Sequence, residues 1–269
     1  MSAWKVLLTD GLEENGQAIL RASAELVDKT GISADDLLQI VGEYDALIVR
    51  GRTKVTPAVF AAGKNLKVVG RAGVGVDNID LNAAREAKVT VVNSPLATSV
   101  SVAELTLGLM LSVMRDLPRA DATMKAGKWL KKEFEGVELY KKTLGVIGFG
   151  RIGVAVANRA KAFEMDVIGY DPLIPSDEIQ KRGGTPVTLD ELLAKADVIT
   201  MHIPLTAESR GMLNAAAFAK MKDGVRIVCA ARGGVIDEEA LLQALESGKV
   251  AAAGLDVFTA EPPGLTPLV

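Results

Sequence analysis

The clearest candidates for chemistry are three glycines, Gly148, Gly150 and Gly153, spaced as G-x-G-x-x-G. An apolar stretch at 143–147 precedes them and a helix-compatible stretch follows, so they occupy a predicted strand-to-helix turn. In such a turn the first glycine permits the tight bend and the second lets the backbone approach a pyrophosphate. The third lets the helix pack closely on the strand. The helix N-terminus would add N–H groups and a positive dipole end for the phosphates.

Asp171 ends the next predicted strand, 166–170, and lies 18 residues after Gly153. A carboxylate at this position can accept hydrogen bonds from a ribose 2′-OH and would repel a 2′-phosphate. The ordered succession of strand, glycines, helix, strand and acid therefore predicts a dinucleotide site that favours NAD over NADP.

Arg232 follows another apolar strand and precedes two glycines, Gly233 and Gly234. A planar guanidinium at the C-terminal end of a strand suits a bidentate grip on a substrate carboxylate. The alternative is a structural ion pair with an acid such as Asp237. We favour the substrate role because Arg232 lies at the same sheet edge as the glycine turn.

Asp256 and Glu261 lie at and after the end of the last predicted strand. Asp256 is placed to bind a nicotinamide carboxamide, and Glu261, before two prolines, to orient and charge-stabilise a histidine. Both residues fit equally well as loop acids that cap nearby backbone.

His202 is the only histidine of the chain and directly follows the predicted strand 197–201. Hydride transfer at a carbinol needs a proton acceptor of near-neutral pKa, for which histidine is the usual choice. One histidine at a strand end is a weak signal, however. We interpret His202 as a residue that hydrogen-bonds backbone beside the cofactor.

These residues need two parallel sheets to position them. Strands predicted at 5–9, 46–50, 66–70 and 89–93 alternate with helices in a domain of residues 1–98. Strands at 143–147, 166–170, 197–201, 225–229 and 250–256 alternate with helices in a domain of residues 99–269. A long helix predicted at 101–117, with Ser101 and Glu104 as a capping box, is apolar almost all round, which suggests burial between domains or between subunits. The fold class is therefore α/β with two doubly wound parallel sheets, a flavodoxin-like small domain and a Rossmann domain.

The loops of the first domain carry Arg50, Arg52 and Lys54 after one strand and 71–75, a glycine-rich run, after the next. Ligands of open parallel sheets meet the C-terminal strand ends, so both loops are ligand-facing candidates. On the spacing alone, we interpret the basic triplet as solvated loop charges.

The net charge and the cysteine count limit the classes of partner that the chain is expected to bind. The net charge of −3 gives no reason to expect nucleic acid or an anionic membrane as partner. Cys229 is the only cysteine, so disulfides within the chain are impossible, and a thiolate metal cluster is unsupported. These features fit a reducing, cytoplasmic setting and a small-molecule ligand.

Taken together, the residues resemble the D-isomer-specific 2-hydroxyacid dehydrogenase family along the whole chain. The matching segments are Val49-Arg50, Gly70–Asp80, Asn93–Pro95, Ser101–Thr106, Gly148–Gly153, Tyr170–Pro172, His202–Thr206, Ala231–Asp237, Gly254–Phe258 and Glu261–Pro263. The resemblance implies NAD-linked oxidation of a phosphorylated 2-hydroxy acid, D-3-phosphoglycerate, to 3-phosphohydroxypyruvate, the entry to serine synthesis. It also implies a homodimer built around the helix at 101–117, possible further assembly to a tetramer, and no metal.

The resemblance assigns roles to individual residues. Arg232 would hold the carboxylate and carbonyl region of the substrate, and Glu261 would raise the pKa of a catalytic histidine. Arg50, with Lys54 or Arg71, would meet the phosphate. The implied substrate-binding residues are Arg50, Arg71, Gly73, Val74, Gly75 and Arg232. The implied cofactor-binding residues are Val74, Gly148, Gly150, Arg151, Ile152, Gly153, Asp171, His202, Ile203, Pro204, Ala230, Ala231, Arg232 and Asp256.

One departure from the family pattern bears on activity. The family's acid/base histidine lies in a His-Leu-Gly motif shortly after the Glu-Pro-Pro loop, and these 269 residues contain no such motif. We expect the full-length protein to be a dehydrogenase and this chain, with a C-terminally incomplete NAD domain, to bind NAD but turn over poorly or not at all. We also expect the small domain, held by one connection, to move more freely.

Two other functions fit the same residues. The first is a reductase of glyoxylate, hydroxypyruvate or another short 2-keto acid. The second is an NAD-sensing interaction module, which should expose a partner segment; the sequence shows no basic or low-complexity extension of that kind.

Overall fold

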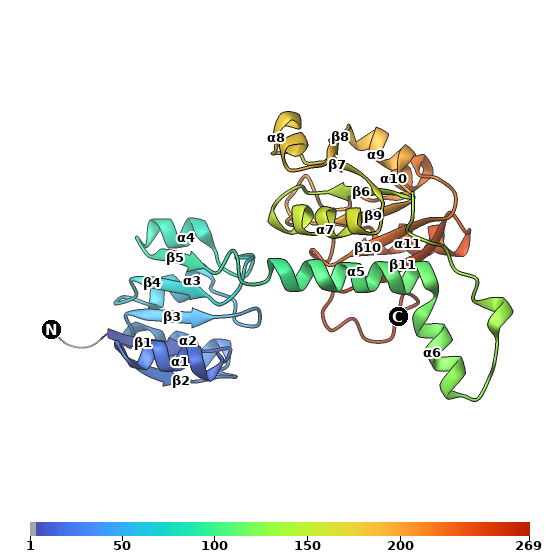
Figure 1. Ribbon diagram of the computed structural model, residues 1–269. Coiled ribbons are helices and arrows are strands. Elements are labelled where there is room, and N and C mark those ends of the chain that lie inside the picture. The colour runs from blue at the N-terminus through green and yellow to red at the C-terminus, as the bar shows by residue number, and fades with distance from the viewer. Residues whose placement is uncertain (1–3) are drawn as a thin grey trace. The chain divides into compact units, whose positions relative to one another are not determined.

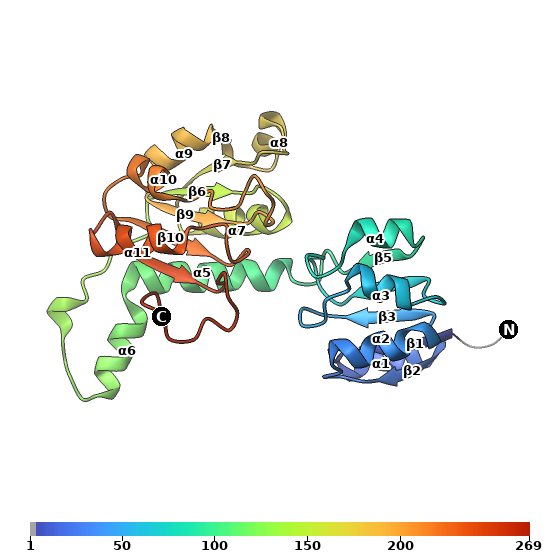
Figure 2. The ribbon, with the colours of Figure 1, turned by 180° about the vertical axis from the view of Figure 1, so that it is seen from behind.

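The computed structural model describes residues 4–269, and the chain divides into two compact units (Figures 1 and 2). Unit 1 runs to Thr98, and unit 2 spans Ser99–Val269. In the described part of the chain, no helix is long and apolar enough to cross a membrane.

Unit 1 is a parallel sheet with helices between its strands. Its strands follow the order β2-β1-β3-β4-β5, which is the flavodoxin-like order. Its elements are β1 (Trp4–Leu8), α1 (Glu14–Arg21), β2 (Ala24–Asp28), α2 (Ala34–Ile40), the 3-10 turn η1 (Val41–Glu43), β3 (Ala46–Val49), α3 (Pro57–Ala62), β4 (Val68–Arg71), α4 (Leu81–Glu86) and β5 (Thr90–Asn93). Its core includes Leu7, Leu47, Val49 and Val69, each without exposed surface, because the inner strands are covered on both faces.

Strand β2 is absent from the sequence-based prediction, which placed four strands in this domain. It pairs with β1 at the sheet edge and carries charged Glu25 and Asp28 among half-buried Leu26 and Val27. An edge strand buries little of its surface, so its apolar signal is weak.

Unit 2 is a six-stranded parallel sheet in the order β11-β10-β9-β6-β7-β8. Counted along the unit, this is the Rossmann order, with the direction of winding reversing between β6 and β9. Its elements are α5 (Ser99–Arg115), α6 (Leu117–Lys125), the 3-10 turn η2 (Lys131–Glu133), β6 (Thr143–Ile147), α7 (Arg151–Ala162), β7 (Asp166–Tyr170), α8 (Ser176–Lys181), β8 (Thr185–Pro186), α9 (Leu189–Lys195), β9 (Val198–Met201), α10 (Ala215–Lys220), β10 (Val225–Cys229), α11 (Glu238–Glu246) and β11 (Val250–Leu255).

The parallel α/β fold class is confirmed, but some boundaries are wrong. Helix α5 begins at Ser99, so Ser101 lies inside the helix and the predicted capping box does not exist. Asp116, in the left-handed region at φ 53°, separates α5 from α6, and Pro118 lies in the first turn of α6. Helices α6 and α8 and the two-residue strand β8 were not predicted.

Helix α5 packs against α7, β10 and β11 and buries one face, which includes Ala103, Met110 and Met114. Leu105 on α5 is exposed in the single chain. The burial of this helix between domains or between subunits stays a prediction. From the end of α5, α6 and the segment after it project away from the sheet of unit 2 (Figures 1 and 2).

Candidate functional site

The glycine turn lies at the switch point of unit 2, between β6 and α7. Gly148 adopts φ 95°, a conformation that favours glycine, and its N–H donates to the Tyr170 carbonyl at 2.8 Å. A Cβ on Gly153 would lie 2.0 Å from the Gly148 carbonyl oxygen, so only glycine allows the helix to approach the strand this closely. A Cβ on Gly150 would meet no atom within 4 Å. The space above Gly150 is therefore open, as a pyrophosphate cradle requires.

The side chain of Phe149 anchors the glycine turn to the core of unit 2, a role that the sequence did not indicate. Its side chain has no exposed surface and fits against two glycines of neighbouring segments. Cβ atoms on Gly169 and Gly184 would lie 2.6 Å and 2.4 Å from the ring. The buried ring thus anchors the turn to the core of unit 2.

Asp171 ties the end of β7 to the same turn. Its carboxylate accepts the N–H of Phe149 at 2.8 Å, and also those of Leu173 and Ile174 at 2.8 Å and 3.1 Å. A carboxylate has about four acceptor positions, so one remains for a ribose hydroxyl. Arg182 donates to the Phe149 carbonyl at 3.1 Å, which adds a further tether. The ribose role of Asp171 stays a prediction, and its role in holding the turn is new.

His202 abuts the turn through its backbone. Its N–H donates to the Ile147 carbonyl at 2.7 Å, and its own carbonyl lies against Gly148. The ring shares a hydrogen bond of 3.0 Å between Nε2 and the Thr200 hydroxyl, while Nδ1 is enclosed without a partner. The main-chain N–H of His202 thus makes a hydrogen bond to backbone, as predicted, while the ring bonds a side chain; its place beside the cofactor stays a prediction.

Burial lowers the pKa of His202 to about 3, although the residue retains some exposed surface. The ring nitrogens decide the protonation state, and of these Nδ1 is enclosed while Nε2 is hydrogen-bonded to Thr200. His202 is thus neutral at physiological pH and poorly placed to exchange a proton with a substrate. Ile203, which follows it, is buried, and Pro204 is exposed.

The loops after β10 and β11 meet beside Gly233. A Cβ on Gly233 would lie 1.8 Å from the Phe258 carbonyl oxygen, so the two loops touch through backbone. Half-buried Arg232 follows buried Ala230 and Ala231, and its Nη1 donates to the Ala231 carbonyl at 2.6 Å.

Two carboxylates, those of Asp256 and Glu261, lie in the loop that follows β11. Glu261 accepts the Phe258 N–H at 3.1 Å. Partial burial, and then the nearby charge of Glu261, raise the pKa of Asp256. Two neighbouring carboxylates of this kind favour a donor or a cation between them. Asp237, the alternative partner proposed for Arg232, caps α11 by accepting the Ala240 N–H at 3.1 Å.

In unit 1 the loop after β4 is held in place around Gly73 and Val74. The Gly73 carbonyl accepts the Ser94 N–H at 2.9 Å, and the Val74 carbonyl accepts the Asn93 amide at 2.6 Å. The Arg71 guanidinium covers Gly73 so closely that a Cβ there would lie 1.5 Å from Nη1. This loop therefore presents fixed backbone at Gly73 and Val74 at the strand end.

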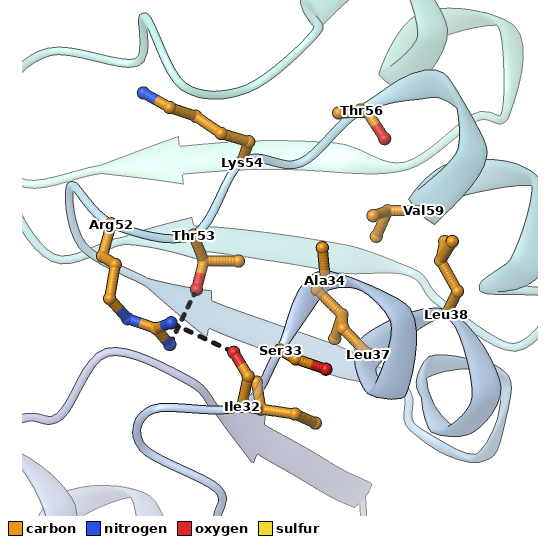
Figure 3. Close-up of a pocket in the computed structure, with 10 residues that line it drawn as sticks. All are labelled: Ile32, Ser33, Ala34, Leu37, Leu38, Arg52, Thr53, Lys54, Thr56 and Val59. Carbon is orange, nitrogen blue, oxygen red and sulfur yellow. Dashed lines mark hydrogen bonds between the residues drawn. The ribbon is translucent and has the colours of Figure 1, made fainter.

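The structure separates the three basic residues of the loop after β3. Exposed Arg50 has no guanidinium hydrogen bond or ion pair among the described residues. The side chain of Arg52 is 50% exposed, but its guanidinium is occupied within the unit: it donates to the carbonyls of Thr9 and Ile32 at 2.7 Å and 3.0 Å. Lys54 is exposed and lines the same pocket as Arg52, and its amino group points away from the other labelled side chains (Figure 3). Arg50 is thus the arginine of this loop that is available to a ligand.

Two doubly wound parallel units, one with a glycine turn at its switch point, define a dinucleotide-binding α/β protein. The chain belongs to the D-isomer specific 2-hydroxyacid dehydrogenase family: the model of that family's NAD-binding domain matches residues 107–269. The cofactor is accordingly NAD.

Relatives and solved structures agree with this family. The chain is 51% identical over 266 residues to D-3-phosphoglycerate dehydrogenase of Methanocaldococcus jannaschii, covering 98% of this chain and 51% of that protein. It is 48% identical over 264 residues to hydroxypyruvate reductase of Thermotoga maritima, covering 98% of this chain and 85% of that protein. A crystal structure of glyoxylate reductase from Paecilomyes thermophila matches with TM-score 0.92 and 34% identity, covering 100% of this chain and 85% of that one. The chain thus spans about half the length of the phosphoglycerate dehydrogenase it matches.

Proposed function

We propose that the protein oxidises D-3-phosphoglycerate to 3-phosphohydroxypyruvate with NAD, in the cytoplasm and in service of serine synthesis. The observation that carries the proposal is the exposed Arg50 guanidinium at the C-terminal end of β3, a cation suited to a substrate phosphate. The identity of about half to a D-3-phosphoglycerate dehydrogenase supports the same substrate.

NAD, when bound, accepts the hydride from the carbinol carbon. The open cradle above Gly150 and the first-turn N–H groups of Arg151 and Ile152 would hold its pyrophosphate. Asp171 would accept a ribose hydroxyl, and Asp256 would accept the carboxamide N–H of the nicotinamide. Arg232 would grip the substrate carboxylate.

We further propose that these 269 residues bind NAD and substrate but turn over poorly by themselves. Glu261 would charge-stabilise a histidine, yet the sole histidine, His202, is neutral and its Nδ1 is enclosed. Loss of a general acid/base lowers the rate by about 10²–10⁴-fold. Normal NADH production by this chain in a steady-state assay would contradict the proposal.

Arg50→Ala tests the substrate. With NAD present, we expect its affinity for D-3-phosphoglycerate to fall about 10–100-fold, because a charge-assisted hydrogen bond contributes about 1.5–3 kcal/mol. The affinity of the same variant for hydroxypyruvate, which has no phosphate, should differ from that of the wild type by less than about twofold. Isothermal titration calorimetry measures both, with Lys64→Ala, an exposed lysine of the same unit, as the control.

Equal losses for both ligands would favour the second candidate, a reductase of glyoxylate, hydroxypyruvate or another short 2-keto acid. The names of the Thermotoga maritima relative and the Paecilomyes thermophila structure support that candidate.

We also propose a homodimer that uses the α6 arm, residues 117–137. Leu117, Met124 and Trp129 of this arm are exposed, and Trp129 is 74% exposed. Met124, Trp129, Leu130 and Phe134 line one hollow on its surface. Exposed apolar groups gathered in this way mark protein–protein contact sites.

Trp129→Glu is expected to convert the dimer to a monomer, because a carboxylate would be buried at the contact. Sedimentation velocity should show a mass of twice the chain for the wild type and of one chain for the variant. Leu173→Glu, at an 86% exposed position outside the arm, should remain dimeric. A variant at position 129 that stays dimeric would place the contact elsewhere.

A further inference from the structure

Asp10 is a buried carboxylate that lies beside the Arg50 loop. It follows β1, and the register of β1 on β3 pairs Leu8 with Ile48, which brings Asp10 opposite Arg50. Its side chain is only 3% exposed. A buried charge needs partners. Among the described residues, the hydrogen-bond and ion-pair partners of the Asp10 carboxylate all lie in the loop 50–53.

The partners of Asp10 fix the main chain of this loop. Oδ2 accepts the N–H of Arg50 at 2.7 Å and that of Thr53 at 3.0 Å, while Oδ1 accepts the Thr53 hydroxyl. Burial by itself would raise the pKa of Asp10. The hydrogen bonds from Thr53 and Arg50 and the charge of Arg52 outweigh burial, so the pKa is lowered.

Arg52 completes this arrangement from within unit 1. Its Nη2 lies 3.2 Å from Asp10 Oδ1, and the guanidinium also donates to the carbonyls of Thr9 and Ile32 and to the Thr53 hydroxyl. Figure 3 shows the guanidinium turned toward Ile32 and Thr53. Arg52 thus balances the charge of Asp10, and the positive charge of Arg50 is left for a ligand.

Asn78, in the loop before α4, holds the same segment from another direction. Its side-chain amide, which is buried, donates to the carbonyls of Arg50 at 2.9 Å and Thr53 at 2.7 Å. Both main-chain polar groups of Arg50 are therefore bound by side chains from two other loops: the N–H by Asp10 and the carbonyl by Asn78. This fixes the direction in which the Arg50 side chain leaves the backbone.

We propose that Asp10 is a positioning residue for substrate recognition, and that with Asn78 it aims Arg50 at the phosphate of the substrate. Arg52 belongs to this support and is not itself a phosphate ligand. The inference rests on the proposed function for the identity of the substrate, but the support of Arg50 is a property of unit 1 that can be measured separately.

A double-mutant cycle in the 269-residue chain tests the inference. Asp10→Ala should weaken D-3-phosphoglycerate binding at least tenfold, and less than twofold when Arg50 is already alanine, because Asp10 acts through Arg50. The affinity for NAD should stay the same in all four proteins. Asp10→Asn, which keeps the shape of the side chain and removes its charge, is the second variant in case alanine impairs folding. Losses that add independently, or no loss, would overturn the inference.

A second readout does not depend on the reaction. Amide hydrogen exchange at Arg50 and Thr53 should quicken at least tenfold in Asp10→Ala, while exchange in β6 of unit 2 stays unchanged. Unchanged exchange at Arg50 and Thr53 would overturn the positioning role whatever the substrate is. If the wild type binds no D-3-phosphoglycerate, the proposed function fails, and the same cycle is read with inorganic phosphate. Coupling to Arg50 would then uphold the positioning role, and absence of coupling would overturn it.

Discussion

Gly150→Ala is expected to abolish measurable NAD binding while unit 2 stays folded. No atom lies within 4 Å of the added Cβ, so the methyl group meets nothing in the protein and instead fills the space proposed for the pyrophosphate. We expect NAD affinity to fall at least about 100-fold, or about 2.7 kcal/mol. Isothermal titration calorimetry with NAD measures the loss.

Gly153→Ala, three residues along, should act on the fold itself. Its Cβ would lie 2.0 Å from the Gly148 carbonyl, so α7 must shift away from β6. We expect a loss of about 1–3 kcal/mol in the free energy of unfolding, as for overpacked cores. Gly108→Ala, at an exposed helical position with no atom within 4 Å, is the matched control and should be neutral or stabilising. Normal NAD binding by Gly150→Ala would show that the cradle does not hold the pyrophosphate.

The free energy of unfolding of unit 2 is expected to fall by about 2 kcal/mol between pH 7 and pH 5, because of His202 alone. Burial lowers the pKa of this histidine from 6.5 to about 3 in the folded protein. Between these values the unfolded chain binds a proton that the folded chain does not, so acidification favours unfolding. The stability is present above pH 6.5 and is lost as the pH falls toward 3.

His202→Gln should remove this pH dependence, since glutamine is uncharged throughout the range. Urea unfolding at pH 7 and pH 5 measures it, with the transition of unit 2 identified by its shift on adding NAD. The lowered pKa values of Asp10 and Asp197 act in the same direction only below about pH 4, outside the window. All other titratable groups contribute equally to the pH dependence of both proteins, so the difference between wild type and variant isolates His202. Equal slopes for the two proteins would mean that the ring is accessible to protons.

The sequence predicted those features whose cause is local. Gly148 and Gly153 were identifiable because a tight turn and a close helix approach restrict the residue at each position, whatever lies elsewhere in the chain. Inner strands such as β6 and β9 were predicted for a similar reason, since strands covered on both faces need unbroken apolar runs. Edge strands β2 and β8 lack such runs.

The supports of the site were not predicted because their partners are distant in the chain. Asp10 lies 40 residues before Arg50, and only the register between β1 and β3 brings them together. The fit of Phe149 depends on Gly169 and Gly184, which serve the ring only once β7 and β8 have paired beside the turn. Arg52 resembled Arg50 in sequence, and only the carbonyls that it contacts distinguish their roles.

The support of Arg50 by Asp10 and Asn78 also bears on the entropy of binding. Fixing the backbone of one residue costs about 1–2 kcal/mol, and a flexible loop would lose this freedom each time a ligand bound. Here both main-chain groups of Arg50 are already bonded before any ligand arrives. What remains to be ordered is one side chain, at about 0.5–1.5 kcal/mol. More of the attraction between guanidinium and phosphate is then available as affinity, even for a substrate of only a few atoms.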